Sequence, residues 1–452
     1  MNRLIKNALV FTVTAVLLTG IVGCGSGKEN LGNSSTVQSE TTSVATTTAK
    51  SKVSLVFATN WGEGDSKYTY FDPKFKEFQK ANADTMDIVL ETNSTEDFKT
   101  KIKIQTASGD LPSAFTYWGG AMMNNMVDAG LLLDVDEYFN ASSTVKRDNF
   151  EPTSFSYYTA ADGKTYGVPL ESTRGIFLVN TEIFKKYNLQ VPKTYDELKN
   201  VSKILNQNGI IPIAMASNGG TPAEFFFSEL YNQYSGAAEE IKNFTASRKF
   251  NTSNAVKVAA NIQDMISNNM FPKDTVANGG WGPCLQLYTD QKAAMTYTYP
   301  WMFESIPEEI QKISDIVPIP KLPDADIDPA NIMSGFTVYG CVIKKAAFTD
   351  TVTHDAMVKL CDFLASDDLS TNLTKSGMIP AKKITVDMNG QKLIYQKMMS
   401  YAEGKNLIQV HFSTIPSQSA LSMLDTSLDE LFINALTPQA FVDKVQAALD
   451  KK

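Results

Sequence analysis

The chain has 452 residues and a formal net charge of −8 at pH 7, with 41 Lys and Arg residues against 49 Asp and Glu residues. It contains no Lys/Arg-rich run, and an acidic chain without one is a poor nucleic-acid binder. This length exceeds what one hydrophobic core usually holds, so two domains are expected.

The first 23 residues are expected to be an export signal. Arg3 and Lys6 precede a continuous apolar stretch over residues 8–22, which is the pattern of a charged n-region and an apolar h-region. About 15 helical residues span roughly 22 Å, which is shorter than the ~30 Å hydrocarbon core of a bilayer. A permanent membrane span is therefore not expected, and removal of the signal would bring the net charge to about −10.

The apolar stretch ends at a cysteine. Ile21-Val22-Gly23 leads directly into Cys24, and this resembles the lipobox of bacterial lipoproteins. The resemblance implies cleavage before Cys24, acylation of its thiol, and attachment to the outer face of the cytoplasmic membrane, as in a Gram-positive bacterium. Two acyl chains on one residue suffice for stable anchoring. The alternative is a free signal peptide followed by a chance cysteine.

Residues 24–51 are expected to form a flexible linker behind the lipidated cysteine. The segment NSSTVQSETTSVATTTAKS is rich in Ser and Thr and has few apolar residues. It cannot bury enough apolar surface to offset the entropy lost on ordering. An anchor, a linker and a globular body predict a protein that works outside the cell and close to the membrane.

The first part of the body alternates between predicted strands and helices. KVSLVFATN reads as a strand that ends in a loop at Trp61-Gly62, and MDIVLET and AFTY read as further strands. Between them, DPKFKEFQKANA predicts a helix with Asp72 as N-cap and Pro73 at its first position. EDFKTKIKIQTAS predicts a second helix, which ends at Gly109. This alternation is typical of an α/β fold with a mainly parallel sheet.

Later segments add two helices with clear start signals. In KTYDELKNVSKILNQNG, Thr194 and Glu197 form a T-x-x-E capping box, and Gly209 ends the helix. The chain ends with TPQAFVDKVQAALDKK, in which Thr437 is the expected cap and Pro438 the first helical residue.

The cysteines and histidines give no catalytic or metal motif. Cys284, Cys341 and Cys361 have no CxxC spacing and are expected to be buried as small hydrophobic residues. His354 is expected on the surface, and His411 is either a structural residue or a ligand contact. No GxSxG or HExxH context is present. Neither a cofactor nor a metal ion is therefore expected.

Four segments in this order resemble the large family of bacterial extracellular solute-binding proteins that includes maltose-binding protein. They are YGVPLESTRGIFLVNTEIFKKYNLQVPKTYDELKNVSKIL, DQKAAMTYTYPWMFESIP, GFTVYGCVIKKA and LTPQAFVDKVQAALDKK. The resemblance implies a two-lobed α/β fold of type II, with mixed sheets flanked by helices and with hinge strands between the lobes.

The resemblance also implies a division of the chain and a function. On this template the N-terminal lobe takes residues 52–169 and 338–383, and the C-terminal lobe takes residues 170–337 and 384–452. A ligand would lie between the lobes, and hinge closure would trap it. The implied function is capture of a mono- or oligosaccharide for the transmembrane permease subunits of an ABC transporter, by a monomer without enzymatic activity.

The four tryptophans are the first candidates for a sugar site, because each lies beside Gly or Pro and therefore at an element end. Trp61 and Trp118 each follow a predicted strand, and the carboxyl ends of strands form the ligand crevice in α/β sheets. An indole offers a flat apolar surface to the C–H face of a pyranose. Hydroxyl groups at the rim then need polar partners, since an unpaired buried polar group costs about 1–3 kcal/mol.

Carboxylates accept hydrogen bonds from neighbouring hydroxyl groups, and Arg offers a fork of donors. Asn60 and Asp65 are further possible contacts. The expected ligand-binding residues are Trp61, Glu63, Tyr117, Trp118, Glu171, Arg174, Trp281 and Trp301.

Several of these residues have a structural alternative. The tryptophans could pack in the core or, for Trp281, anchor a loop. Glu171 could form a surface salt bridge and Arg174 an ion pair between the lobes. Phe225 to Phe227 could be either cleft wall or helix core, and SQSALSML lacks the aromatic residue that some sugar-binding relatives place near the C-terminus.

Two other functions compete with sugar capture. A glycosidase needs two carboxylates about 5–5.5 or 6.5–9.5 Å apart, and Glu63, Asp65 and Glu171 could supply them. A receptor of the same fold could instead bind a peptide or a polyamine, or could serve sensing rather than transport.

Overall fold

The computed structural model describes residues 52–237, 239–240, 248–408, 412 and 417–451. His411 and the predicted signal, lipidation site and linker lie outside these residues. No helix within the described part of the chain combines the length and apolar character needed to cross a bilayer.

The first of two main sheets has seven strands, in the order β12-β4-β11-β3-β1-β2, with β13 paired to β11. β1 runs parallel to β2 and β3, whereas β11 runs antiparallel to β3 and β4. The sheet is therefore mixed, with a parallel half as the sequence predicts. Its strands are β1 (Val53–Thr59), β2 (Met86–Thr92), β3 (Ala114–Tyr117), β4 (Val168–Arg174), β11 (Ile332–Ile343), β12 (Ile379–Pro380) and β13 (Asn406–Ile408).

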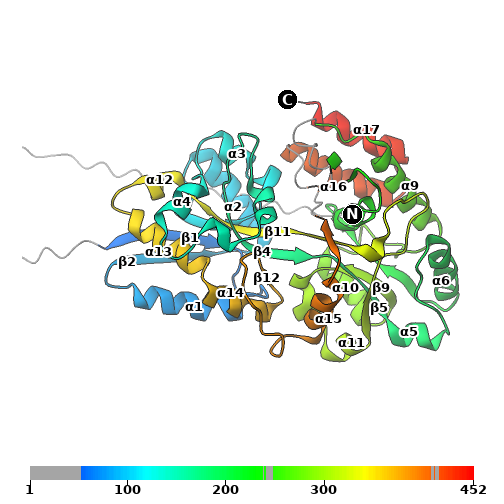
Figure 1. Cartoon of the computed structure of the whole chain (residues 1–452). Coiled ribbons are helices and arrows are strands. Elements are labelled where there is room, and N and C mark those ends of the chain that lie inside the picture. The colour runs from blue at the N-terminus through cyan, green and yellow to red at the C-terminus, as the bar shows by residue number, and fades with distance from the viewer. Residues whose placement is uncertain (1–51, 238, 241–247, 409–411, 413–416, 452) are drawn as a thin grey trace, which may run out of the picture. The chain divides into compact units, whose positions relative to one another are not determined.

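Helices pack against this sheet, and we call the sheet with these helices the first lobe (Figure 1). Phe57 of β1 stacks on Phe75 of α1, and Phe71 packs beside both. The helices are α1 (Tyr68–Ala81), α2 (Thr95–Ser108), α3 (Asn124–Asp128), α4 (Val135–Ala141), α12 (Lys345–Thr349), α13 (His354–Leu364) and α14 (Asp367–Leu373).

The predicted start of α1 is wrong. The helix begins at Tyr68 rather than after Asp72, and Pro73 lies inside it. Phe71 and Phe75 are one turn apart and both fully buried, so their packing outweighs the single backbone hydrogen bond that Pro73 cannot donate. Asp72 is not a cap; its carboxylate accepts a 2.8 Å hydrogen bond from Lys76 one turn later.

The second main sheet has four strands in the order β10-β5-β9-β6, and with its helices it forms the second lobe. The predicted capping box of α6 is confirmed, because Thr194 Oγ1 accepts from the Glu197 N–H and the Glu197 carboxylate accepts from the Thr194 N–H. The strands are β5 (Ile176–Asn180), β6 (Ile211–Ala214), β9 (Ala293–Thr298) and β10 (Ser314–Val317), and the helices are α5 (Thr181–Lys186), α6 (Tyr195–Gln207), α10 (Trp281–Thr289), α11 (Glu308–Lys312) and α15 (Leu393–Ala402).

A helical layer that includes both C-terminal helices completes the second lobe. The predicted cap of the last helix is confirmed, since Thr437 Oγ1 accepts from the Ala440 N–H. This helix packs on two others of the layer. The elements are α7 (Ala223–Tyr231), α9 (Ser253–Ser267), α16 (Gln418–Phe432) and α17 (Pro438–Leu449), beside the short hairpin β7 (Ser217–Asn218) and β8 (Thr221–Pro222).

The predictions for the cysteines and for His354 have different outcomes. Cys284, Cys341 and Cys361 are free and buried, as predicted. His354 is half-buried rather than a solvated surface residue, because its ring packs on Phe348 and its Nδ1 lies 2.9 Å from the Phe348 carbonyl oxygen.

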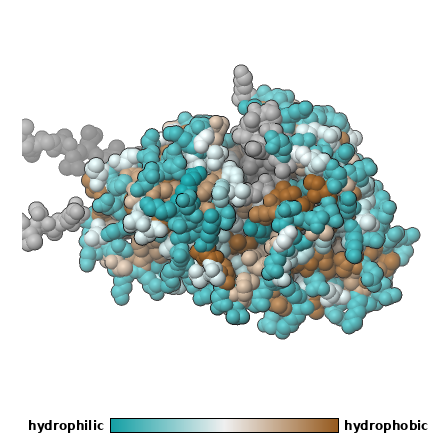
Figure 2. All heavy atoms as spheres, in the orientation of Figure 1, coloured by the Kyte–Doolittle hydropathy of each residue, from teal (hydrophilic) through white to brown (hydrophobic). Residues whose placement is uncertain are grey.

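Figure 2 shows that the face of the molecule in this view is mostly hydrophilic, with apolar residues gathered in a few places.

The chain passes between the lobes at a very close contact. β4 ends at Arg174 in the first sheet, β5 begins at Ile176 in the second, and only Gly175 separates them (Figure 1). A Cβ atom on Gly175 would lie 2.0 Å from the Tyr297 hydroxyl oxygen and 2.7 Å from the Ser334 hydroxyl oxygen. The residue at this crossing must therefore be glycine for the two strands to pack as they do.

We predict that Gly175→Ala lowers the free energy of unfolding by about 1–3 kcal/mol, the usual effect of overpacking a close-packed site. The matched control is Gly390→Ala, since no atom lies within 4 Å of a Cβ at that position. Urea unfolding of both variants measures the difference. Equal stability of the two variants would contradict the steric constraint at the crossing.

Candidate functional site

A cavity of about 900 Å³ lies between the two lobes. Its first-lobe side consists of the loop after β1, the start of α2, and Trp118 after β3. Its second-lobe side consists of residues from α7, α10, α16 and the turn after β9. This volume lies in the upper part of the range for small-molecule sites, about 300–1,000 Å³.

The floor of the cavity comes from β11. Phe336, Val338 and Tyr339 all line the cavity, although neighbouring residues of a strand normally point to opposite faces. The pairing of β11 with β4 shifts register between Thr337 and Tyr339 and again between Tyr339 and Gly340. A register shift of this kind re-aims side chains. It explains how Val338 and Tyr339, adjacent in sequence, reach the same cavity.

Trp61 does not lie where the sequence suggests. Its side chain is only 1% exposed and is not among the residues that line the cavity. Its ring packs at 5.5 Å from Phe71 and 5.9 Å from Tyr339, and its backbone N–H donates to Thr59 Oγ1. Trp61 is therefore a core residue behind the cavity wall, which was the structural alternative at this position. Glu63, two residues later, is exposed and does line the cavity.

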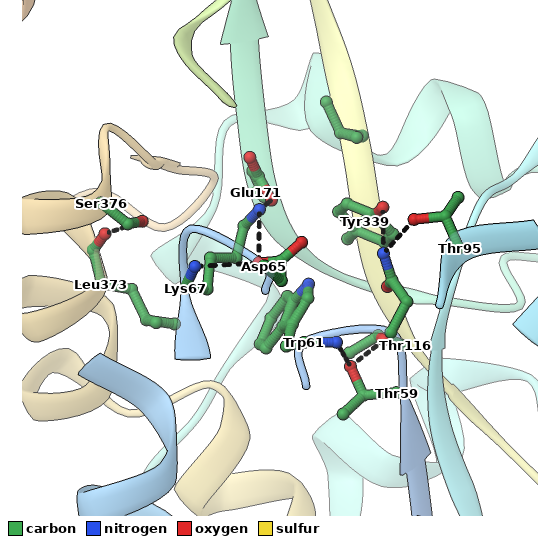
Figure 3. Close-up of polar contacts among 12 residues, drawn as sticks. Thr59, Trp61, Asp65, Lys67, Thr95, Thr116, Glu171, Tyr339, Leu373 and Ser376 are labelled. Atoms are coloured by element: carbon green, nitrogen blue, oxygen red, sulfur yellow. Dashed lines mark hydrogen bonds and ion pairs between the residues drawn. The ribbon is translucent and has the colours of Figure 1, made fainter. Parts of the chain in front are cut away.

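A buried ion cluster lies beside Trp61 (Figure 3). Lys67 Nζ is 3.3 Å from Glu171 Oε2 and 3.9 Å from Asp65 Oδ1, and it faces the rings of Trp61 and Tyr339 at 5.8 and 5.4 Å. The side chains of Lys67 and Glu171 are 3% and 2% exposed. Glu171 therefore forms an ion pair, as the structural alternative proposed, but the pair is buried rather than at the surface, and Glu171 does not line the cavity.

The charges in this cluster oppose one another. Burial raises the pKa of the Glu171 carboxyl to about 7, although the Lys67 ammonium lowers it in part. Burial also disfavours the charge on Lys67, but Asp65 and Glu171 outweigh that effect and its pKa lies above the usual value. Lys67 is thus a fixed positive charge. Asp65 and Lys67 line the cavity, whereas Glu171 lies behind them.

Tyr117 and Arg174 also lie outside the cavity lining. Tyr117 is buried in β3 with its ring 5.4 Å from Trp118. Arg174 is half-buried, and its Nη1 donates to the Thr173 carbonyl oxygen at 2.7 Å. Burial lowers the pKa of Arg174. Within the described residues it has no acidic side chain at ion-pair distance, so the alternative of an inter-lobe ion pair is not observed.

Trp118, in contrast, is half-buried and lines the cavity. Its ring lies 4.9 Å from Tyr339, and Lys99 Nζ lies 5.2 Å from the ring centroid. Lys99 is also ion-paired with Glu96 at 2.8 Å. Trp118 is the indole that the first lobe presents to the cavity.

On the second-lobe wall, Phe225, Trp281 and Trp301 form a cluster that we call the aromatic corner. Phe225 lies 5.3 Å from Trp281 and 5.9 Å from Trp301, each edge to face, and the two indoles meet at 5.5 Å and 89°. Tyr299 stacks on Trp301 at 4.5 Å with an angle of 3° and fixes it from behind. All three rings of the corner line the cavity.

Both alternatives for the phenylalanine run apply, each to different residues. Phe225 lines the cavity, whereas Phe226 and Phe227 are buried in the core. This follows from helix geometry, because consecutive residues of α7 point about 100° apart.

The sequence reasoning missed several polar residues of the cavity. Lys67, Glu224 and Asp425 are among those that line it. Glu224 directly precedes the phenylalanine run, and only the aromatic residues of that segment were considered as cavity residues. Lys67 directly precedes α1, and the start of this helix was predicted too far along the chain. Asp425 directly follows SQSALSML, the segment that lacks an aromatic residue. Leu421 and Asp425, both on α16, line the cavity there. No local signal in the sequence marks Asp425.

We predict that Lys67→Met destabilises the fold, and more strongly at pH 8 than at pH 5. Without Lys67, no ammonium lowers the pKa of Glu171, so burial raises this pKa further and the folded state holds Glu171 protonated. The free energy of unfolding then falls as pH rises through the raised pKa, because the folded state must either keep this proton or bury an unpaired charge. Removing one partner of a buried pair costs about 3–5 kcal/mol when the other stays charged.

The double variant Lys67→Met with Glu171→Gln should recover much of this loss and lose the added pH dependence. Denaturant unfolding of the wild type, both single variants and the double variant at pH 5 and pH 8 gives the coupling energy. Additive effects at both pH values would contradict a coupled pair.

Comparison with known proteins gives one consistent relationship. The family model for bacterial extracellular solute-binding proteins matches residues 61–366. An uncharacterized ABC transporter extracellular-binding protein of Pyrococcus horikoshii is 22% identical over 389 residues, covering 84% of this chain and 83% of its own.

Solved structures share the fold. A chitin oligosaccharide binding protein has a TM-score of 0.75 at 20% identity and covers 88% of this chain and 98% of its own. A structure from work on xylan utilization by the thermophilic bacterium Caldanaerobius polysaccharolyticus has a TM-score of 0.74 at 22% identity, covering 87% and 99%. The fold is the expected two-lobed α/β architecture of type II. The chain therefore belongs to the family of bacterial extracellular solute-binding proteins.

Proposed function

We propose that this protein is the carbohydrate receptor of an ABC transporter. It takes up a mono- or oligosaccharide in the cavity between the lobes and delivers it to the transmembrane permease subunits. The observation that carries this proposal is the set of half-buried rings on both walls of the cavity, Trp118 on one side and the aromatic corner on the other. Carboxylates and hydroxyl groups between the rings can then accept and donate hydrogen bonds.

Similarity to other receptors supports a sugar as the ligand. Structural neighbours include the chitin oligosaccharide binding protein and a maltose/maltodextrin-binding domain from Bdellovibrio bacteriovorus bound to maltotriose. We propose Glu63, Trp118, Trp281 and Trp301 as direct ligand contacts. Trp61, Tyr117, Glu171 and Arg174 then support the walls from behind.

The same proposal includes the lobes and their movement. We propose that residues 52–169 and 338–383 move as one half and residues 170–337 and 384–452 as the other, so that the boundaries cut β4 and β11 and place β13 of the first sheet with the second half. The crossing at Gly175 and the β11 strand then act as the hinge. The receptor acts as a monomer and binds its ligand without chemical conversion. Glu171 is committed to Lys67, which removes one of the three carboxylates that a glycosidase could have used.

We predict that the purified protein binds members of a panel of mono- and oligosaccharides in calorimetric titration, with a change in tryptophan fluorescence. Trp281→Ala should weaken binding about tenfold or more, since a buried aromatic side chain contributes about 1.5–3 kcal/mol and 1.4 kcal/mol is tenfold. The matched control is Tyr187→Ala, which removes a half-buried aromatic side chain of the same lobe that does not line the cavity and should leave affinity within about twofold. No response to any of a chemically varied set of glycans would refute the carbohydrate assignment.

We also propose that Cys24 carries a lipid anchor at the outer face of the cytoplasmic membrane, in a Gram-positive bacterium. The prediction is that the protein fractionates with membranes and that Cys24→Ala releases it into the medium. Mass spectrometry of the N-terminal peptide checks the modification directly. An unmodified peptide that begins elsewhere than Cys24 would contradict the anchor without affecting the ligand assignment.

A further inference from the structure

The second-lobe wall of the cavity holds two carboxylates that have no cationic partner among the residues that the structure describes. Glu224, at the start of α7, is 3% exposed, and Asp425 on α16 lines the same cavity. Glu224 accepts hydrogen bonds from the Ser228 hydroxyl at 3.4 Å and from the Phe412 N–H. Neither carboxylate has an ion pair in the described part of the chain. In contrast, Glu96 and Glu304 of the same cavity pair with Lys99 at 2.8 Å and with Lys392 at 3.2 Å.

The other charged side chains near Glu224 and Asp425 do not neutralise these two carboxylates. Asp429, one turn after Asp425 on α16, accepts from Ser217 Oγ at 2.6 Å and from the Gly219 N–H at 3.0 Å. Lys99, on α2 of the opposite lobe, attracts Asp425 but is already paired with Glu96.

Burial and like charge act in the same direction on both groups. Burial and the nearby Asp425 raise the pKa of Glu224 to about 8, against its two hydrogen bonds. Burial and Asp429 raise the pKa of Asp425 to about 7, with Lys99 opposing. Both carboxyls are therefore largely or partly protonated near pH 7 until a positive charge approaches them.

The aromatic corner adjoins these carboxylates and offers a second attraction for a cation. Phe225 follows Glu224 directly on α7, and it meets Trp281 and Trp301 edge to face. Rings at such angles form the sides of a box. The faces of aromatic rings attract ammonium groups within about 6 Å, and Trp attracts them most strongly.

We propose that the ligand carries a protonated amine, and that Glu224 and Asp425 bind this ammonium beside the aromatic corner. This inference rests on the proposed function and specifies the class of carbohydrate, namely an amine-bearing sugar. The hydroxyl groups of a neutral sugar can complete the hydrogen bonds of the two carboxyls, but they leave both groups in their protonated form, because no positive charge offsets their like charges. An ammonium supplies both N–H donors and the missing positive charge.

The shared chemistry is an ammonium group, which could belong to a sugar or to a free polyamine. A matched pair of probes separates charge from shape: a glucosamine oligomer and the N-acetylated oligomer of the same length, in which the amine is neutral. Spermidine is the third probe. Calorimetric titration of the wild-type protein near pH 7, at low salt and in two buffers of different ionisation enthalpy, reports both affinity and protons released.

The glucosamine oligomer should bind at least about tenfold more tightly than its acetylated counterpart, because charge-assisted hydrogen bonds are roughly twice as strong as neutral ones. Where the oligomer enters with its amine protonated, its binding should release protons, since the ammonium drives carboxyls of raised pKa to ionise. Affinity for it should therefore rise with pH until the amine of the free oligomer begins to lose its own proton.

Glu224→Gln and Asp425→Asn keep the shapes of the side chains and remove their charges. Each variant should reduce the preference for the amine by several-fold and should reduce the proton release, and the double variant should abolish it. Affinity for the acetylated oligomer should fall less than affinity for the amine, because the amide side chains keep hydrogen-bonding groups and lose only the charge. The matched control Glu309→Gln removes an exposed carboxylate outside the cavity and should change neither ligand's affinity.

The outcomes separate this inference from the proposed function. If the acetylated oligomer binds as tightly as the amine, without proton release, the ammonium site is wrong and the carbohydrate receptor stands. If spermidine binds and no glycan does, the ammonium site is supported and the carbohydrate assignment fails. If no probe and no other glycan binds, both fail.

Discussion

The antiparallel pairing of β4 with β11 is the constraint on which the rest of this structure depends. These two strands share the first sheet; β4 leads into the second lobe, and β11 returns from it (Figure 1). β4 carries Glu171 on its way to the crossing at Gly175, and β11 carries the floor of the cavity. The register shifts on either side of Tyr339 therefore affect which side chains of β11 face the cavity.

The two walls of the cavity differ in whether other side chains of the protein pair with their charged groups. On the first-lobe wall, Lys67 is enclosed by Asp65, Glu171 and two aromatic rings, so its charge is compensated by the protein itself. On the second-lobe wall, Glu224 and Asp425 have no such partner among the described residues. A buried charge is stable only when paired, and the raised pKa values of Glu224 and Asp425 reflect carboxyls that keep their protons when no cation is near. Charge compensation within the protein thus distinguishes a scaffold residue from a candidate contact.

Local signals in the sequence predicted the elements well but the cavity only in part. The capping box at Thr194 and the cap at Thr437 depend on residues three apart, and both form as predicted. Trp61 beside Gly62 correctly marks the end of β1, yet a loop residue can fold back into the core, and packing against Phe71 and Tyr339 decides that. Neither partner is visible from the local pattern.

The carboxylates of the second-lobe wall are even harder to identify from local sequence patterns than Trp61. Glu224 and Asp425 are about 200 residues apart in the chain, and each lies on a helix whose apolar residues form a normal buried face. Only the packing of α7 and α16 beside one cavity brings their charges together. Because the energy of a charge depends on burial and on neighbours at a few ångströms, the specificity of such a site arises from tertiary structure. The aromatic residues of a sugar-type cleft can be suspected from their neighbours in sequence, whereas the electrostatics that select among ligands cannot.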